Sequence, residues 1–171
     1  AVNAIGAARA PHLHTVISCG NQAVLDASDY VIALAAQEGV RAIALYLEAE
    51  GDGARLAEGL AMCAQREIGV VVLKSGRSAL GATAAAAHTG AVAGDAAVLR
   101  ALIEDAGGAW VDDPHELLET AKAMAHGRRK VGAGVAVITC SGGDAAISAD
   151  EADRLGISLP PLAEATTAAL E

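Results

Sequence analysis

The chain has 171 residues, of which 53% are hydrophobic and 2% aromatic, with 12 basic and 21 acidic side chains. This length suffices for one domain with a buried core and part of a second. An acidic chain with so few aromatic side chains lacks the positive surface and the stacking platforms that nucleic-acid binding requires. The longest alanine-rich stretch, from Ala79 to Leu102, is interrupted by polar and charged residues, which argues against a membrane-spanning helix.

Short runs rich in β-branched residues alternate with longer runs rich in helix-forming residues. The predicted strands are His14–Ser18, Arg41–Leu47, Gly69–Lys74, Ala109–Val111 and Gly134–Thr139. The predicted helices are Leu25–Glu38, Asp52–Arg66, Asp95–Ala106, Pro114–Ala125, Gly143–Leu155 and Ala163–Leu170. The second and third strands are continuously apolar, as is typical of strands buried on both faces of a parallel sheet. This alternation predicts a flavodoxin-like α/β fold with three layers and a parallel sheet.

One segment is typical of a linker between domains. Residues 126–134 are basic and glycine-rich, follow a predicted helix and precede a predicted strand. We expect residues 1–125 to form a flavodoxin-type domain that lacks its first strand–helix unit, because residues 1–10 resemble the end of a helix with no strand before it. We expect residues 135–171 to begin a second, similar α/β domain.

The segment Lys74–Gly94 contains the first candidate for chemistry. Its small residues allow a ligand or another part of the backbone to approach closely, and it presents His88 just before a Thr-Gly pair. Glu48 lies at the carboxyl end of the strand predicted over residues 41–47, and ligands of open α/β sheets bind at such ends. A carboxylate there can hold one imidazole nitrogen and leave the other free as a nucleophile. The residues alone leave open that His88 is a surface histidine and that Glu48 and Glu50 are solvated loop acids.

A glycine-rich turn before the helix predicted over residues 143–155 is the second candidate. Backbone N–H groups of Ser141, Gly142 and Gly143 can bind an anion at the start of that helix. The turn lacks the lysine of a P-loop, and similar turns are common in α/β proteins. Asp144 can instead cap the helix, and its charge opposes an anion.

A third loop contains Gly20 and Asn21 and follows the first predicted strand. Its spacing also fits an ordinary turn in which Asp26 caps the next helix. The three cysteines, Cys19, Cys63 and Cys140, are widely spaced and predict neither disulfides nor a metal site. We expect them to be small buried side chains in a cytoplasmic protein.

The chain resembles the NDP-forming acyl-CoA synthetases, relatives of succinyl-CoA ligase whose modules recur in some bacterial protein acetyltransferases. The resemblance covers essentially the whole chain, and its most specific motif is the HTGAxAG sequence that follows KSGR. It is carried, in this order and spacing, by GNQAVLDASDY, ALYLEAEGDGARL, VVVLKSGRSALGATAAAAHTGAVAG and VAVITCSGGDAAISADEADRLGI. The fold that it implies is a succinyl-CoA ligase-like flavodoxin domain, followed by the start of a similar one.

The resemblance also implies roles for particular residues. His88 would be transiently phosphorylated, relaying phosphate between an acyl phosphate and NDP or NTP, and Glu48 would orient it. The implied phosphate-binding residues are Thr89, Gly90, Ser141, Gly142 and Gly143, and the implied substrate-site loop contains Gly20 and Asn21. The complete enzyme would use CoA, a small carboxylic acid and ATP or ADP with Mg. Its CoA-binding and ATP-grasp domains would lie in the same chain or in a separate subunit, and homo-oligomers are possible. This chain alone is expected to be inactive and to bind neither CoA nor nucleotide tightly.

A second function stays open, that of a non-catalytic regulatory or assembly module, for example within a bacterial protein acetyltransferase. Family members commonly have serine where this chain has Ala87, and a small or apolar residue where it has Asp144. These two departures favour the non-catalytic module. The presence of His88 together with Glu48 favours the synthetase.

Overall fold

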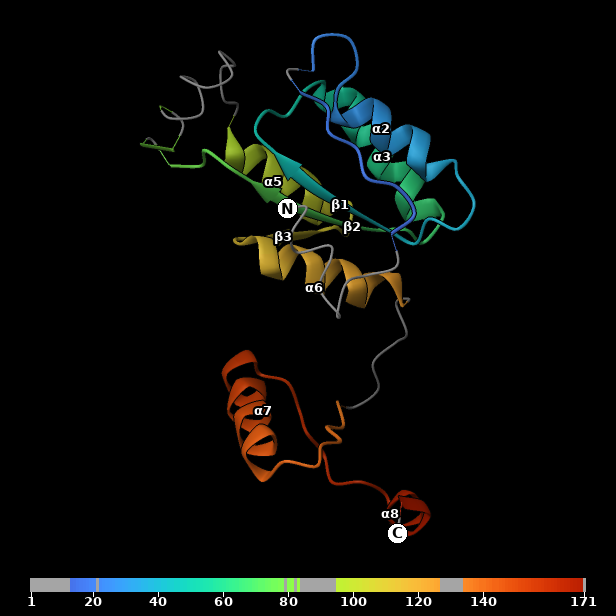
Figure 1. The fold of residues 1–171 in the computed structure, drawn as a ribbon, viewed down its shortest axis with the longest axis vertical. Coiled ribbons are helices and arrows are strands. Elements are labelled where there is room, and N and C mark those ends of the chain that lie inside the picture. Colours follow the sequence, from blue (N-terminus) through green and yellow to red (C-terminus); the bar gives the residue numbers. More distant parts are fainter. Residues whose placement is uncertain are drawn as a thin grey trace. The chain divides into compact units, whose positions relative to one another are not determined.

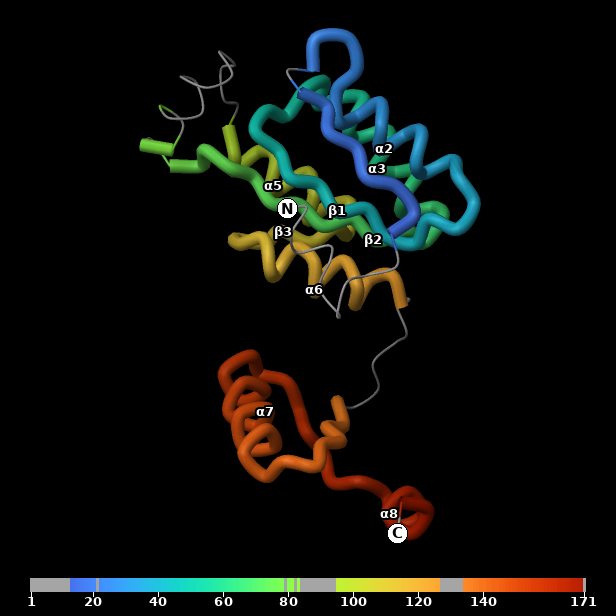
Figure 2. Tube along the Cα trace, viewed as in Figure 1, coloured from blue at the N-terminus to red at the C-terminus, as the bar shows by residue number. Residues whose placement is uncertain are grey.

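The computed structural model describes residues 13–20, 22–78, 80–81, 83, 95–126 and 134–170. Its sheet has three parallel strands in the order β1 (Ala42–Leu47), β2 (Gly69–Lys74) and β3 (Ala109–Val111). β1 pairs with β2 from Ala42–Gly69 to Leu47–Lys74, and β2 pairs with β3 from Val71–Ala109 to Leu73–Val111. Figure 2 traces the chain through these strands and the helices between them. The predicted parallel sheet is confirmed.

Helices cover both faces of this sheet, which gives the three layers that the sequence predicts (Figure 1). α2 (Ala27–Ala35), α3 (Gly53–Gln65) and α5 (Ala96–Asp105) lie on one face, and α6 (Pro114–Ala125) lies on the other. α3 connects β1 to β2 and α5 connects β2 to β3. None of the helices in the described ranges is both long and apolar enough to cross a membrane.

β2 is the centre of the core because alternate side chains point to opposite faces of the sheet. Val70 and Val72 belong to the cluster under α2, α3 and α5, whereas Val71 and Leu73 pack against α6. Every residue of β2 is buried, including the final lysine. The continuously apolar sequence of this strand is therefore explained by burial on both faces.

Aspartates begin the four helices that surround the sheet. The N-caps of α2, α3, α5 and α6 are Asp26, Asp52, Asp95 and Asp113, whose carboxylates accept hydrogen bonds from backbone N–H groups in the first turn. Such caps satisfy N–H groups that have no partner within the helix. The predicted helices Asp52–Arg66 and Asp95–Ala106 are each one residue too long at both ends because the prediction included the capping residues.

Two predicted strands are wrong. Residues 14–18 and 134–139 have no β-ladder in the structure. A strand is stable only where a neighbour accepts and donates its backbone hydrogen bonds, and no described strand lies beside either segment. The prediction for the cysteines is correct only for Cys63, which is buried, because Cys19 is half-buried and Cys140 is exposed.

The chain divides into two compact units, Ala1–Gly127 and Arg128–Glu171. In the second unit, α7 (Gly142–Leu155) ends at Gly156, whose φ of 67° is the left-handed conformation favoured at helix ends. The N–H of Val135 donates to the carbonyl of Ser158 at 2.9 Å, so the chain folds back after α7. A short helix, α8 (Glu164–Leu170), completes the described part of this unit.

Candidate functional site

The loops that follow the three strands meet at the carboxyl edge of the sheet. Glu48 directly follows β1, Ser75 follows β2 and Asp112 follows β3. In open α/β sheets this edge is where ligands bind. The polar side chains near it are therefore candidates for chemistry.

Lys74, the last residue of β2, connects two of these loops from a buried position. Its side chain is only 1% exposed, and its Nζ donates to the carbonyl oxygen of Glu48 at 2.9 Å and to that of Ser75 at 2.7 Å. The same Nζ lies 3.7 Å from Oε1 of Glu50. A buried ammonium group needs such partners because burial removes its hydration. Lys74 therefore holds the backbone of Glu48 against the loop that begins at Ser75.

This arrangement changes the interpretation of the two glutamates that follow β1. The side chain of Glu50 is only 18% exposed and pairs with Lys74, so it is not a solvated loop acid. Glu48 is partly buried and lies where the sequence predicted it, at the carboxyl end of β1.

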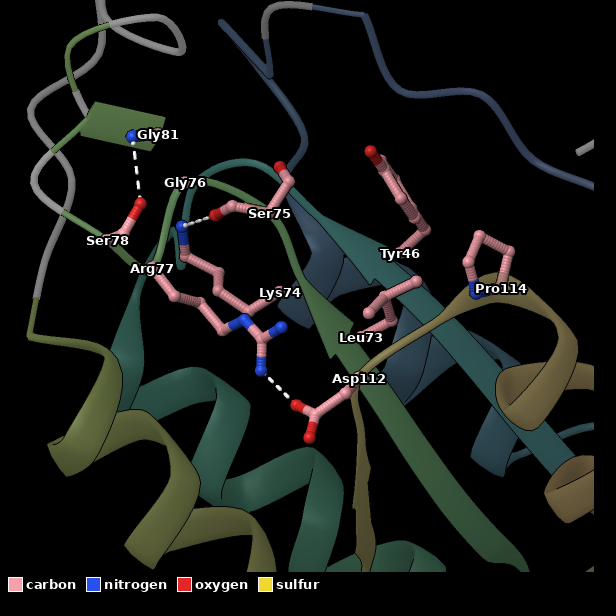
Figure 3. Close-up of a pocket in the computed structure, with 10 residues that line it drawn as sticks. All are labelled: Tyr46, Leu73, Lys74, Ser75, Gly76, Arg77, Ser78, Gly81, Asp112 and Pro114. Carbon is pink, nitrogen blue, oxygen red and sulfur yellow. Dashed lines mark hydrogen bonds and ion pairs between the residues drawn. The ribbon is translucent and has the colours of Figure 1, made fainter.

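A pocket of about 600 Å³ opens at the same edge (Figure 3). The guanidinium of Arg77 forms a hydrogen-bonded ion pair with Asp112 and so connects the loops after β2 and β3. In the same loop, Oγ of Ser78 accepts a hydrogen bond from the N–H of Gly81 at 3.0 Å. The pocket is lined by Tyr46, Leu73, Lys74, Ser75, Gly76, Arg77, Ser78, Gly81, Asp112 and Pro114.

Several predicted site residues lie outside the described part of the chain. These are His88, Thr89, Gly90 and Asn21, together with Ala87. The contact between Glu48 and His88 therefore stays a prediction. Gly20 is described and has a φ of 57°, a conformation that glycine adopts readily.

The loop after Gly20 leads to a carboxylate that joins two helices. Asp26 caps α2, accepting from the N–H groups of Ser28 and Asp29, and its Oδ2 also accepts from the N–H of Asp52 at 2.7 Å. Burial raises the pKa of Asp26, but the hydrogen bonds from the Ser28 hydroxyl and from these backbone groups outweigh it and lower the pKa overall. Asp26 is thus the capping residue that the spacing allowed.

Side chains of the turn before α7 form hydrogen bonds with some of its own backbone N–H groups. Oγ of Ser141 accepts from the N–H of Asp144 at 3.2 Å, and the N–H of Ser141 donates to Oγ1 of Thr139 at 3.1 Å. Ser141, not Asp144, is therefore the N-cap. Of the described turn, the N–H groups of Gly142 and Gly143 have no hydrogen-bond partner within the described ranges.

A comparison with known protein families decides which family the chain belongs to. The sequence pattern of a family described as the succinyl-CoA ligase like flavodoxin domain matches residues 1–124. The chain belongs to this family of NDP-forming acyl-CoA synthetases and succinyl-CoA ligases. This match confirms the family resemblance and the flavodoxin-like fold that were inferred from the sequence.

Individual relatives agree with this family. The chain is 38% identical to the alpha subunit of an ADP-forming acetate–CoA ligase II from Pyrococcus furiosus, over 88% of its own length and 32% of the relative's. It is 35% identical to an ADP-forming 4-hydroxybutyrate–CoA ligase from Nitrosopumilus maritimus, over 84% of its own length and 21% of the relative's. The chain thus spans a third or less of the length of these relatives.

A solved structure of the family has the same fold. The dinucleotide-forming acetyl-coenzyme A synthetase 1 of Ca. Korarchaeum cryptofilum, in complex with phosphate and ADP, superposes with a TM-score of 0.72 at 29% identity. The superposition covers 85% of this chain and 32% of that one.

Sequence reasoning missed three residues at the carboxyl edge, Lys74, Arg77 and Asp112. Lysine at the end of an otherwise apolar strand was the available signal for the first, because the buried strand carries it into the interior. No local signal connects Arg77 to Asp112, because they are far apart in sequence and meet only when β2 and β3 pair.

Proposed function

We propose that this chain is the part of an NDP-forming acyl-CoA synthetase that carries a transiently phosphorylated histidine, His88. Phosphate displaces CoA from an acyl-CoA to give an acyl phosphate. The imidazole of His88 then attacks the phosphorus, which releases the carboxylic acid and leaves phosphohistidine. Transfer of that phosphoryl group to NDP gives NTP and restores the free histidine, and each step also runs in reverse.

The position of Glu48 is the observation that carries this proposal. Glu48 follows β1 at the carboxyl edge, and Lys74 fixes its backbone beside the loop that leads from β2 towards the HTGAxAG motif. In the proposed site its carboxylate accepts a hydrogen bond from the protonated ring nitrogen of His88, so that the other ring nitrogen is the nucleophile. Family membership supports the assignment of both residues.

The remaining predicted residues have supporting roles in the proposal. Thr89, Gly90 and the turn of Ser141, Gly142 and Gly143 would bind phosphate, and Gly20 and Asn21 would belong to the substrate-site loop. The N–H groups of Gly142 and Gly143, which have no partner among the described residues, support this role, because the N-terminus of a helix attracts anions.

The whole protein would also need parts that bind CoA and nucleotide. Because the chain spans a third or less of its relatives, we propose CoA-binding and ATP-grasp domains in the same chain or in a partner subunit. Residues 1–125 would belong to a ligase-like flavodoxin-type domain, 126–134 would be a linker and 135–171 would belong to a second ligase-like domain. The substrates would be CoA, a small carboxylic acid and ATP or ADP with Mg, in the cytoplasm. The chain alone would be inactive.

A non-catalytic regulatory module is the second candidate. Asp144 lies in the first turn of α7, where its negative charge opposes the binding of a phosphoryl group. Ala87 also replaces the usual serine before the histidine. A module of this kind would keep the fold without forming phosphohistidine.

Phosphorylation of the full-length protein separates the two candidates. Incubation with γ-labelled ATP and Mg should produce an acid-labile phosphohistidine, found by mass spectrometry at His88. His88→Asn should abolish it, whereas His115→Asn, which changes an exposed histidine on α6, should leave it intact. Glu48→Gln should slow it by about 10²-fold, as expected for the loss of an orienting contact. Unchanged labelling of the His88→Asn protein would refute the proposal.

A further inference from the structure

The pocket at the carboxyl edge has two chemically different walls. Tyr46, Leu73 and Pro114 form an apolar wall, and Arg77 and Ser78 lie across the pocket from it (Figure 3). An apolar surface with a few polar groups is the usual composition of a small-molecule site. The pocket therefore fits a ligand with a hydrocarbon part and a charged end.

Arg77 has hydrogen-bond donors that no residue in the described ranges uses. Its Nη1 donates to Asp112, and within the described residues its other nitrogens make no hydrogen bond. A guanidinium has five N–H donors in a planar fork, and two of them can bind one carboxylate side by side. One edge of Arg77 thus holds Asp112, and no described residue occupies the other edge. The side chain is 37% exposed, so a ligand can reach it.

Lys74 also lines the pocket but does not offer a comparable charge. Its Nζ is already shared by the carbonyl oxygens of Glu48 and Ser75 and by the carboxylate of Glu50. A ligand would have to break these buried contacts to bind it. Arg77 is therefore the cation that an incoming anion would contact.

We propose that this pocket binds a small organic acid, with the carboxylate on the free edge of Arg77 and the hydrocarbon part over Tyr46, Leu73 and Pro114. The apolar wall favours such an acid over inorganic phosphate, which has nothing to bury there. That this ligand is the acid substrate rests on the proposed function. The binding itself does not, because it requires neither His88 nor nucleotide.

The first test measures binding to the 171-residue chain by NMR. Sodium butyrate, sodium acetate and inorganic phosphate are titrated separately at constant ionic strength, following the amides of Ser75 to Ser78. Butyrate should give saturable shifts and bind about tenfold tighter than acetate, because each fully buried methylene contributes about a factor of four. Phosphate should bind more weakly than butyrate. Equal affinity for all three anions would overturn the proposal.

Variants then separate binding by Arg77 from a purely structural role. Arg77→Ala should weaken butyrate binding by about tenfold or more, as expected for the loss of a charge-assisted hydrogen bond. Arg100→Ala is the matched control, because Arg100 is an exposed arginine that pairs with Glu104 on α5. It should leave the affinity unchanged. Circular dichroism checks that both variants fold, and unchanged butyrate binding by a folded Arg77→Ala chain would overturn the proposal.

Asp112→Asn gives an outcome that a structural ion pair would not produce. It removes a negative charge that repels the ligand carboxylate on the other edge of Arg77, so butyrate should bind severalfold tighter. If Arg77 and Asp112 only held the two loops together, the same change would weaken binding, and that result would overturn the proposal.

The binding test and the phosphorylation test fail independently. If butyrate binds but the full-length protein forms no phosphohistidine, the proposed function fails and the pocket assignment stands. If His88 is phosphorylated but butyrate does not bind, only the pocket assignment fails.

Discussion

Replacement of the buried lysine tests whether the carboxyl edge is held together as described. Lys74→Met keeps an unbranched side chain of similar length but removes the ammonium group. The change deletes two hydrogen bonds from a charged donor to the carbonyl oxygens of Glu48 and Ser75, and the contact with Glu50. Hydrogen bonds of charged groups contribute about 1.5–3 kcal/mol each. The methionine side chain also avoids the cost of burying a charged ammonium group, which offsets part of this loss. We therefore expect the free energy of unfolding to fall by about 3 kcal/mol.

Urea unfolding followed by tryptophan fluorescence measures this loss. The chain has one tryptophan, Trp110, which lies half-buried in β3 and therefore reports on the first unit. A loss of this size corresponds to a decrease in Tm of about 10 °C for a domain of this length. Lys122→Met is the matched control, because Lys122 pairs with Glu119 on the surface of α6 and such pairs contribute under about 1 kcal/mol. A Lys74→Met chain no less stable than the control would refute the role of Lys74.

Three further predictions concern the first unit and the cysteines. Because the pKa of Asp26 is lowered in the folded state, its stabilisation is present above the unfolded pKa of 3.8 and is lost as the pH falls through the folded pKa. Denaturation between about pH 6 and pH 3 should therefore show a smaller loss of stability for Asp26→Asn than for the unchanged chain. Burial raises the pKa of Cys63, so a thiol reagent at neutral pH should modify exposed Cys140 first and reach Cys63 only on unfolding. Gly69→Ala should lower the free energy of unfolding by about 1–3 kcal/mol, because a Cβ there would lie 2.5 Å from Cβ of Met124. The same urea assay measures this loss, and an unchanged midpoint would show that α6 can shift.

The sequence predicted the elements that local chemistry controls. The predicted helices Asp52–Arg66 and Asp95–Ala106 began at the aspartates that cap α3 and α5, and the apolar run Gly69–Lys74 indicated a strand buried on both faces. These signals are local, because helix caps and hydrophobic patterns each involve residues only a few positions apart. The same local rules failed for residues 14–18, where a β-rich run has no neighbouring strand to pair with among the described residues.

The candidate site was predictable only in part. Glu48 could be placed from sequence, because the end of an apolar strand in an open sheet is a recognisable position. The burial of Glu50 could not, because it depends on the ammonium group at the end of a different strand. His88 was predicted from its motif, and it lies outside the described residues, so its place in the site stays a prediction.

By itself the sequence determined that this chain forms a parallel α/β layer with polar side chains at the ends of its strands, since hydrophobic patterning and helix caps depend on neighbouring residues. Only the tertiary structure decided which side chains meet there. The register of β1, β2 and β3 brings the ammonium group of Lys74 to the carbonyl oxygen of Glu48, and the guanidinium of Arg77 to the carboxylate of Asp112. Those contacts join residues far apart in the chain, and their existence depends on the alignment of strand ends rather than on any local preference.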